Sequence, residues 1–345
     1  MTEQMANSMS MLTPCRQPAT QSWSEMQRTH RAERLHSVAS ELHMCAASLR
    51  NGKSFQTPIV NAMTVDVEDY FQVSAFEGSI PRSRWDSFES RVVRNTDRLL
   101  ELFQNANIHA TFFVLGWVAA RYPALVRRIA EGGHELGSHG FSHRLVYDQS
   151  PEEFREDLRR SRAAISEAAS APILGYRAPS FSITPRSLWA LDIILEEGFE
   201  YDASIFPIRH DRYGLPSAPR HFHSMERPAG TLWECPGSTV RLAGTNLPVA
   251  GGGYFRLLPY AWTRWGISNL NNRERRPAIF YLHPWEIDPE QPRLPASYAT
   301  RVRHYTNLHK TEKRLTRLLS QFQFAPLNQI LRIAGGLATP VTSAG

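Results

Sequence analysis

Hydrophobic and polar positions alternate between two periods along the middle of the chain. Short apolar runs of the kind that form buried strands occupy residues 59–66, 111–115, 134–138 and 279–282. Apolar residues recur every three or four positions, as on the covered face of a helix, over 96–107, 123–131 and 188–195. Strands that alternate with helices of this length predict a parallel sheet covered by helices.

Residues that favour helix ends mark the expected boundaries. Asn95 is a plausible cap for the helix over 96–107. Ser150, followed by Pro151 and two glutamates, predicts the start of another helix, and Thr184 with Pro185 repeats that signal. Because six or more strand–helix units fit the pattern, we expect a closed or nearly closed barrel with active residues at the carboxyl ends of its strands.

The two ends of the chain differ from this middle part. Residues 1–57 are polar and rich in Ser, Gln and Arg, and we expect a disordered extension with at most a short helix within 23–49. Residues 326–345 are expected to form a tail. No apolar run approaches the roughly 18 residues that span a bilayer, and the start lacks an apolar signal-peptide core. These features predict a cytoplasmic protein.

Positive charge is concentrated near the C-terminus. Residues 256–320 carry 12 basic and 5 acidic side chains, whereas residues 63–255 carry 20 and 24. A predicted helix with an apolar face holds six of the basic residues: Arg301, Arg303, Lys310, Lys313, Arg314 and Arg317. A solvated helix face is the plain interpretation, and attraction to the inner membrane surface or to an acidic polysaccharide is the alternative. No nucleic-acid-binding motif accompanies the charge, so we expect no nucleic-acid partner.

Polar clusters follow the predicted strands over 59–66, 134–138 and 279–282, and a further cluster at 177–179 follows a short predicted strand over 173–176. His139 and His143 stand four residues apart, a spacing that lets two imidazoles meet one metal ion. A carboxylate from Asp66–Asp69 would complete a face of two histidines and one carboxylate, which leaves positions open for water and substrate. A second carboxylate and a histidine such as His283 would supply the base and the acid. This inventory fits the metal-assisted hydrolysis of an amide.

The ordered motifs TVDVEDYF, HELGSHGFSH, GYRAPSFS, YDASIFP and YLHPWEID resemble those of the polysaccharide deacetylase family (NodB homology, carbohydrate esterase 4). The segments WECPGSTVRLAGTNLPVAGGGYFRLLPY and RHYTNLHKTEKRLTRLL resemble the C-terminal extension of exosortase-associated members, which are linked to bacterial exopolysaccharide clusters. The resemblance implies an α/β fold, a distorted (β/α) barrel of about seven strands. It assigns residues 58–210 to this barrel and 211–325 to a C-terminal α/β extension that completes it and contributes His283.

The resemblance also implies an activity and a set of catalytic residues. The enzyme would be a metal-dependent hydrolase that removes N-acetyl groups from an N-acetylated oligo- or polysaccharide, or from its lipid-linked precursor, in exopolysaccharide biosynthesis. Asp66 matches the catalytic base and Arg177 the arginine that orients it. His283 matches the general acid and Asp202 the aspartate that tunes this acid.

The metal site departs from the usual family pattern. His139 and His143 match the metal-binding histidines, and the family metal is most often Zn²⁺, with Co²⁺ or Ni²⁺ in some members. Most members carry adjacent aspartates in the first motif, but Val67 follows the first one here. Alternate residues of a strand share a face, so Glu68 is the favoured ligand and Asp69 the alternative.

The resemblance places four residues at the substrate. They are Pro179, Ser180, Leu282 and Trp285. Leu282 would line the pocket for the acetyl methyl group. The third motif lacks the usual aromatic residue after its proline, yet the backbone N–H of Ser180 can still stabilise an oxyanion.

Two other functions stay open. The Asp-x-Glu form of the first motif also resembles deacetylase relatives that open small cyclic amides such as allantoin. A non-catalytic carbohydrate-binding protein with a degenerate barrel is the alternative outside the enzymes. That alternative predicts no bound metal and no change of activity for Asp66→Asn or His283→Ala.

Overall fold

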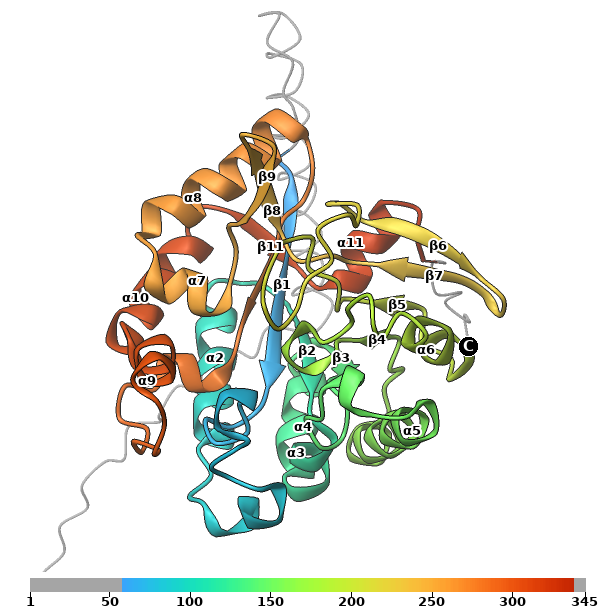
Figure 1. The fold of residues 1–345 in the computed structure, drawn as a ribbon. Helices are drawn as coiled ribbons and strands as arrows, with labels where there is room; N and C mark the ends of the chain where they lie inside the picture. The colour runs from blue at the N-terminus through green and yellow to red at the C-terminus, as the bar shows by residue number, and fades with distance from the viewer. Residues whose placement is uncertain (1–57, 338–345) are drawn as a thin grey trace, which may run out of the picture. The chain divides into compact units, whose positions relative to one another are not determined.

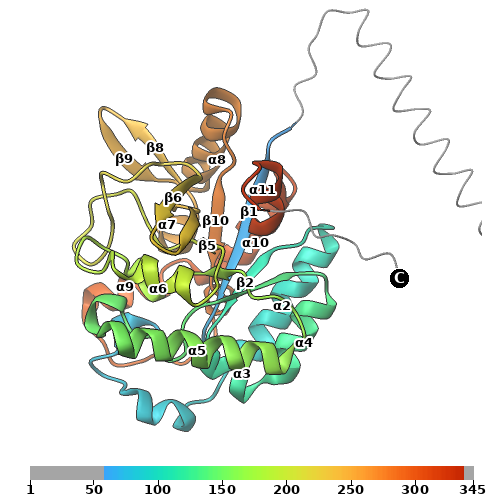
Figure 2. The same ribbon diagram turned by 90° about the vertical axis from the view of Figure 1, so that its right-hand side faces the viewer.

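The structure is a computed structural model that describes residues 58–337. The predicted N-terminal extension, its short helix within 23–49, and the end of the predicted tail lie outside these residues. Figures 1 and 2 show a central sheet with helices packed around it. Within the described residues, no helix is both long and apolar enough to cross a membrane.

Seven parallel strands form the main path of the sheet. In spatial order they are β10 (Ile279–Leu282), β1 (Val60–Val67), β2 (Thr111–Val114), β3 (Glu135–Ser138), β4 (Gly175–Tyr176), β5 (Tyr201–Asp202) and β7 (Gly230–Glu234). β6 (His223–Arg227) adds antiparallel to β7, and β11 (Gln323–Ala325) adds parallel to the start of β1. The Ile279 N–H at the start of β10 donates to Ser238 Oγ, four residues after β7 (2.7 Å). The sheet thus curves into the predicted distorted barrel.

Helices follow the strands on the outside of the sheet. The first group consists of α2 (Val92–Asn105), α3 (Gly116–Arg121), α4 (Pro123–Glu131), α5 (Pro151–Ala168) and α6 (Ala190–Glu196). A second group lies on the left of Figure 1 and consists of α7 (Gly252–Leu257), α8 (Tyr260–Asn269), α9 (Tyr298–Tyr305) and α10 (Leu308–Leu319). A separate hairpin joins β8 (Thr239–Leu242) to β9 (Thr245–Pro248). β10 belongs to the main sheet although it comes late in the chain.

Local signals predicted some helix boundaries and failed at others. The start of α5 is confirmed, because Ser150 and Glu153 form a reciprocal capping box there. The Asn95 cap is wrong: α2 begins at Val92, where Asp69 accepts the backbone N–H groups of Arg91 and Val92. This cap comes from a residue more than twenty positions earlier, which local patterning does not detect.

The basic C-terminal segment forms two helices rather than the single predicted one. α9 ends at Tyr305, and Asn307 adopts a left-handed conformation (φ 59°) immediately before α10. Asparagine tolerates this region better than most residues, so it permits the break. The apolar side of the predicted helix is buried in α10, as expected for Leu308, Leu315, Leu318 and Leu319.

The stretch predicted as a tail contains an ordered helix, α11 (Leu327–Ile333). Leu327, Ile330 and Leu331 are buried in this helix and pack against apolar residues of the sheet. Buried Glu135 on β3 fixes its start by accepting the backbone N–H of Asn328 (3.1 Å). The prediction of a tail from residue 326 is therefore wrong for these residues.

Candidate active site

The carboxyl ends of β1, β3, β4 and β10 bring together most of the polar clusters noted in the sequence. Asp66 lies on β1 and Glu68 follows the strand; both are 2% exposed. His139 comes directly after β3, Arg177 after β4 and His283 after β10. Because parallel strands end at one edge of the sheet, residues from distant parts of the sequence share one site.

Three of these residues form a cluster with metal-ligand geometry. One ligand atom from each of Glu68, His139 and His143 lies within 4.8 Å of the others, and all three side chains are buried. Glu68 Oε2 is 2.6 Å from His143 Nε2. His139 Nδ1 bonds to the carbonyl oxygen of Arg177 (2.8 Å). A carbonyl can only accept, so Nδ1 carries the proton and Nε2 keeps its lone pair for a ligand.

The electrostatics of this cluster suit a cation. Burial raises the pKa of Glu68, but the imidazoles of His143, His283 and His139 outweigh it and hold that pKa well below the usual range. Burial lowers the pKa of His139 to about 4, against the opposing effect of nearby Asp66. An ionised carboxylate and neutral imidazole are the forms that bind metal. Two histidines and a carboxylate are also a donor set that catalytic zinc takes, so the residues fit a divalent ion.

A carboxylate on α5, that of Asp157, fixes the loop between the two histidines. The backbone N–H groups of Phe141 and Ser142 donate to the Asp157 carboxylate (2.7 and 3.2 Å). Gly140 has a positive φ of 72°, and a Cβ there would lie 2.8 Å from the same carboxylate. Arg82 holds the far side of the loop through the carbonyl oxygen of Ser142 (2.6 Å). The loop geometry therefore depends on contacts outside the motif itself.

Asp69, the alternative ligand, has a different environment. Its Oδ2 accepts hydrogen bonds from the Ser90 hydroxyl (2.7 Å) and from the backbone N–H groups of Arg91 (2.8 Å) and Val92 (3.1 Å). Its Oδ1 accepts the backbone N–H of Tyr70 (3.0 Å). These contacts use the carboxylate at the start of α2, and the geometry groups Glu68 rather than Asp69 with the histidines.

Asp66 is held by a buried arginine. Arg177 Nη1 donates to Asp66 Oδ1 (2.7 Å) and to Thr64 Oγ1 (2.8 Å), while its Nε donates to the carbonyl oxygen of Ala203 (3.1 Å). The guanidinium also lies over the ring of Phe113, 4.3 Å from its centroid. These contacts fix Oδ1 and leave Oδ2 of Asp66 facing His283.

His283 faces the carboxylates across the site. Its Nε2 lies 3.8 Å from Asp66 Oδ2 and 3.6 Å from Glu68 Oε1. Its Nδ1 lies 2.7 Å from Glu286 Oε1. Burial lowers the pKa of His283, but the hydrogen bond to Glu286 and the surrounding carboxylates raise it to about 9. The imidazolium is thus the favoured form near neutral pH in the absence of a metal.

Asp202 does not occupy the position that the resemblance implies. Its carboxylate bonds to the Ser204 hydroxyl (2.5 Å), and burial raises its pKa although neighbouring Glu234 and Ser204 lower it. The carboxylate against His283 Nδ1 belongs to Glu286, which sequence reasoning missed. The signal was present as the His-Pro-Trp-Glu run, because a proline-initiated turn brings its fourth residue back to its first.

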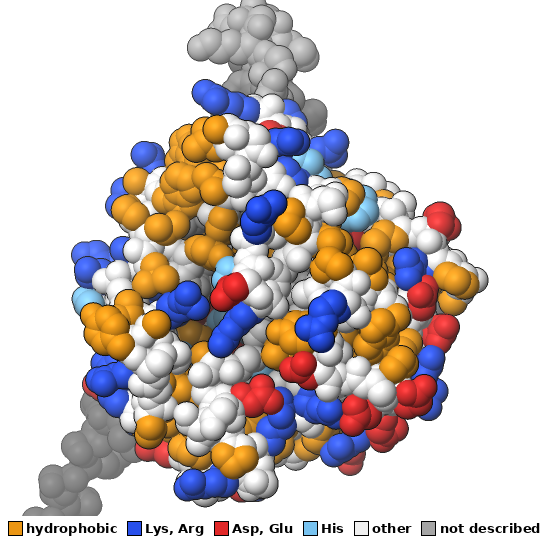
Figure 3. Space-filling model, viewed as in Figure 1, with side chains coloured by type: hydrophobic (Ala, Val, Ile, Leu, Met, Phe, Trp, Pro, Cys, Tyr) orange, Lys and Arg blue, Asp and Glu red, His pale blue; other side chains and the backbone are white. Residues whose placement is uncertain are grey.

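A cleft of about 710 Å³ lies beside these residues, within the range of small-molecule sites. Loops of the barrel, including Ser74 and Ser180, line one side, and the later part of the chain, including Tyr254, Arg256 and Trp285, lines the other. Figure 3 shows this face of the molecule hollowed toward its centre, with basic and apolar side chains around the hollow. The cleft is large enough for a ligand much larger than an acetyl group, and Trp285, which donates to Glu68, lines it.

The four expected substrate residues are in different environments. Ser180 lines the cleft in a left-handed conformation (φ 53°), and its hydroxyl is 2.8 Å from that of Ser74. Trp285 also lines the cleft, and its Nε1 donates to Glu68 Oε1 (3.2 Å). Pro179 and Leu282 are buried, and Leu282 packs in the hydrophobic core rather than on this cleft.

Two family models match separate parts of the chain. The model of the family described as polysaccharide deacetylase matches residues 82–193, and that of a domain of unknown function, DUF3473, matches residues 203–332. Residues 82–193 thus match the polysaccharide deacetylase family. The two matched regions adjoin, so the domain of unknown function carries β7, β10 and His283.

Curated proteins match part of the chain. The chain is 31% identical over 98 residues to a peptidoglycan-N-acetylglucosamine deacetylase of Bacillus cereus. This match covers 28% of the chain and 36% of the relative. The chain is also 27% identical over 99 residues to a chitooligosaccharide deacetylase of Bradyrhizobium. This match covers 29% of the chain and 43% of the relative. The chain thus spans less than half the length of these relatives.

One solved structure supports the fold over most of the chain. It is a crystal structure of a protein from Mycobacterium smegmatis assigned as a polysaccharide deacetylase. The TM-score is 0.54 with 20% identity, over 83% of this chain and 94% of that one. At this identity the likeness shows the α/β barrel fold.

Proposed function

We propose that this chain is a metal-dependent hydrolase that removes N-acetyl groups from the sugars of a polysaccharide or its lipid-linked precursor. The observation that carries the proposal is the cluster of Glu68, His139 and His143 beside an arginine-held Asp66 and opposite His283. Residues 58–210 form the barrel in this proposal, and residues 211–325 form the extension that completes it.

Different residues of the site carry out the separate steps of amide hydrolysis. A divalent ion held by Glu68, His139 and His143, most often Zn²⁺ in this family and Co²⁺ or Ni²⁺ in some members, supplies a Lewis acid and favours the ionisation of water. Asp66 takes a proton from the attacking water through Oδ2, because Arg177 occupies Oδ1. His283 carries a proton on Nε2 and gives it to the sugar nitrogen as the carbon–nitrogen bond breaks.

The oxyanion needs a donor from the protein as well. The backbone N–H of Ser180 has no hydrogen-bond acceptor among the described residues, and Ser180 lines the cleft. We assign this N–H as the donor that stabilises charge on the acetyl oxygen. The unusual backbone conformation of Ser180 then serves to aim the N–H group rather than the side chain.

The size of the cleft and the names of the relatives support a saccharide substrate. The cleft holds about 710 Å³ and is lined by aromatic residues such as Tyr147, Tyr213 and Tyr254, whose faces suit sugar rings. Relatives are a peptidoglycan-N-acetylglucosamine deacetylase and a chitooligosaccharide deacetylase. We place the enzyme in exopolysaccharide biosynthesis, in the cytoplasm at the inner face of the membrane, on the resemblance of its extension to that of exosortase-associated members.

A pair of assays on the zinc-loaded protein tests this proposal against the cyclic-amide alternative. Acetate release is measured from N-acetylglucosamine oligomers of increasing length, and ring opening is measured with allantoin. We expect acetate release that is abolished in Asp66→Asn and negligible ring opening. Ring opening without acetate release would favour the small-amide hydrolase. Inactivity on both substrates together with no metal binding would favour the carbohydrate-binding protein.

A further inference from the structure

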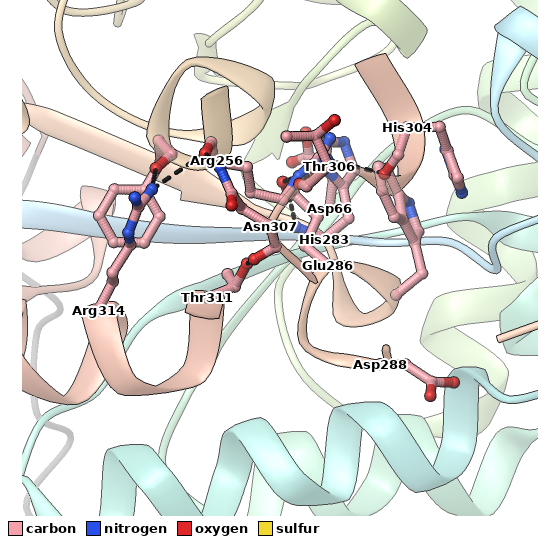
Figure 4. A network of polar contacts seen from close by, with 12 residues as sticks. Asp66, Arg256, His283, Glu286, Asp288, His304, Thr306, Asn307, Thr311 and Arg314 are labelled. Carbon is pink, nitrogen blue, oxygen red and sulfur yellow. Dashed lines mark hydrogen bonds and ion pairs between the residues drawn. The ribbon is translucent and has the colours of Figure 1, made fainter. Parts of the chain in front are cut away.

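We propose that Arg256 and Glu286 are positioning residues for His283, and that the C-terminal extension thereby sets the geometry of the general acid. The proposal rests on the proposed function, because it concerns the proton donor of that reaction. Glu286 takes the place that the family resemblance gives to Asp202, which has no contact with His283 among the described residues. Figure 4 shows the polar contacts that surround His283 and Glu286.

The first contact fixes the orientation of the ring. Glu286 Oε1 lies 2.7 Å from His283 Nδ1 and accepts the backbone N–H of His283 at 3.1 Å. One oxygen therefore holds both the main chain and the side chain of the same residue. An ionised carboxylate only accepts hydrogen bonds, so Nδ1 carries a proton and Nε2 is the nitrogen that faces Asp66 and Glu68.

The second contact fixes Glu286. Arg256 on α7 donates from Nε to Glu286 Oε2 at 2.5 Å, and the two side chains are 3% and 1% exposed. Burial raises the pKa of Glu286, but Arg256 and His283 lower it to about 2, so the carboxylate stays ionised. Each oxygen of Glu286 thus has a dedicated partner, and the carboxylate cannot rotate without losing one of them.

The third set of contacts fixes Arg256 from the turn between α9 and α10. Arg256 Nη1 donates to the carbonyl oxygens of His304 (2.7 Å) and Thr306 (3.2 Å). The left-handed Asn307 donates from Nδ2 to the carbonyl oxygen of Arg256 (2.8 Å). Arg314 on α10 donates to that carbonyl as well (3.0 Å). The break between the two helices therefore has a function, because it turns two carbonyl groups toward the arginine.

Aromatic packing restrains one face of the His283 ring. The Trp285 ring stacks between His283 (centroids 5.1 Å apart, planes at 21°) and His304 (4.2 Å, 16°). The His304 Nε2 is held by Gln291 Oε1 (2.7 Å). Burial and nearby Arg256 lower the pKa of His304 to about 3, so this ring stays neutral. The acid is thus fixed at its edge by hydrogen bonds and at one face by a stack that ends on α9.

Stability alone does not account for this arrangement. A buried ion pair contributes little net stability compared with an apolar pair of the same volume, since both charges lose their hydration. Orientation of a reacting group, by contrast, depends on such fixed contacts, and small displacements cost large factors in rate. Arg256 and Trp285 also line the cleft, so the groups that position His283 lie where a bound saccharide would rest.

The test uses Glu286→Gln and Arg256→Met, with Arg220→Met as the matched control. Arg220 also pairs with a glutamate (Glu274, 3.0 Å) and with a backbone carbonyl (Thr239, 2.6 Å), but it touches no residue of the site. Two substrates are compared on the zinc-loaded enzyme: an N-acetylglucosamine oligomer and an aryl acetate ester. The phenolate of the ester leaves without a proton, so the ester does not need the general acid.

We expect kcat for the oligomer to fall about 10²–10⁴-fold in both site variants, the range that a general acid contributes, with KM changed less than threefold. Ester hydrolysis should fall less than tenfold, and the control should resemble the wild type on both substrates. Equal losses on the two substrates, or unchanged kcat on the oligomer, would overturn the proposal. Arg256→Lys replaces Arg256→Met if the latter does not fold, because lysine keeps the charge but not the fork of donors.

A spectroscopic readout separates this proposal from the proposed function. In metal-free protein labelled with ¹⁵N-histidine, the Nδ1 proton of His283 should give a slowly exchanging low-field NMR signal. The signal should disappear in Glu286→Gln and persist in Arg220→Met. Its persistence in Glu286→Gln would refute the positioning role even if the enzyme is a deacetylase. Its loss would support the role even if the wild type released no acetate.

Discussion

Replacement of Asp69 by asparagine should reduce stability without affecting metal binding. The Asp69 carboxylate accepts four hydrogen bonds, from the Ser90 hydroxyl and three backbone N–H groups at distances of 2.7–3.1 Å. Asparagine presents one acceptor oxygen and removes the charge at the start of α2. A hydrogen bond to a charged group contributes about 1.5–3 kcal/mol and a neutral one about 0.5–1.5. Burial raises the pKa of Asp69, which shows that the buried charge has a cost. Asparagine removes this cost, and the gain offsets part of the lost hydrogen-bond stability.

The expected cost is therefore about 2–3 kcal/mol, or a fall in Tm of about 3–5 °C for a domain of this size. Thermal unfolding followed by circular dichroism measures the fall in Tm. Zinc titration of the same Asp69→Asn variant measures its metal affinity. Glu68→Gln is the paired variant, with about 10-fold or more loss of zinc affinity expected because it removes a ligand charge. Loss of zinc binding in Asp69→Asn with retention in Glu68→Gln would refute the assignment of Glu68.

Two further predictions concern the fold away from the site. Ser150→Ala should lower the free energy of unfolding by about 1 kcal/mol, because the capping box of α5 loses its acceptor for the Glu153 N–H. Denaturant unfolding measures this loss, and a loss below about 0.3 kcal/mol would contradict the prediction. Burial and nearby His109 lower the pKa of His134 to about 4, whereas the unfolded chain binds the proton near 6.5. Stability from His134 is thus present above pH 6.5 and lost as the pH falls toward 4. Between pH 7 and 5 the wild type should lose about 1–2 kcal/mol more than His134→Gln, and parallel pH profiles would contradict this.

The strands over 59–66, 111–115 and 279–282 were predictable because their signals are local. The apolar runs around Val65, Phe112 and Phe280 are buried on both sides in the structure, which is the pattern of parallel strands. The helices were less predictable at their ends. The start of α2 depends on Asp69, and the break before α10 depends on a left-handed Asn307. Both are contacts or conformations that hydrophobic periodicity does not record.

Most of the candidate site could also be predicted, for a topological reason. Residues at the ends of parallel strands converge whatever their separation in sequence, so Asp66, His139, Arg177 and His283 meet. The partner of His283 does not follow from this topology. The His-Pro-Trp-Glu run offers Glu286 as a neighbour, but the arginine from α7 that holds Glu286 is a distant contact that spacing does not reveal. Family resemblance named Asp202 instead, and this chain uses that carboxylate elsewhere.

Metal content measured together with acetate release tests the central claim most directly. Purified wild type and His139→Ala are analysed for bound zinc by elemental analysis, and the same samples are assayed on N-acetylglucosamine oligomers. We predict about one zinc per wild-type chain with acetate release, and loss of both in His139→Ala, since His139 is one of three clustered ligands. Retained metal and full activity in His139→Ala would contradict the site described here.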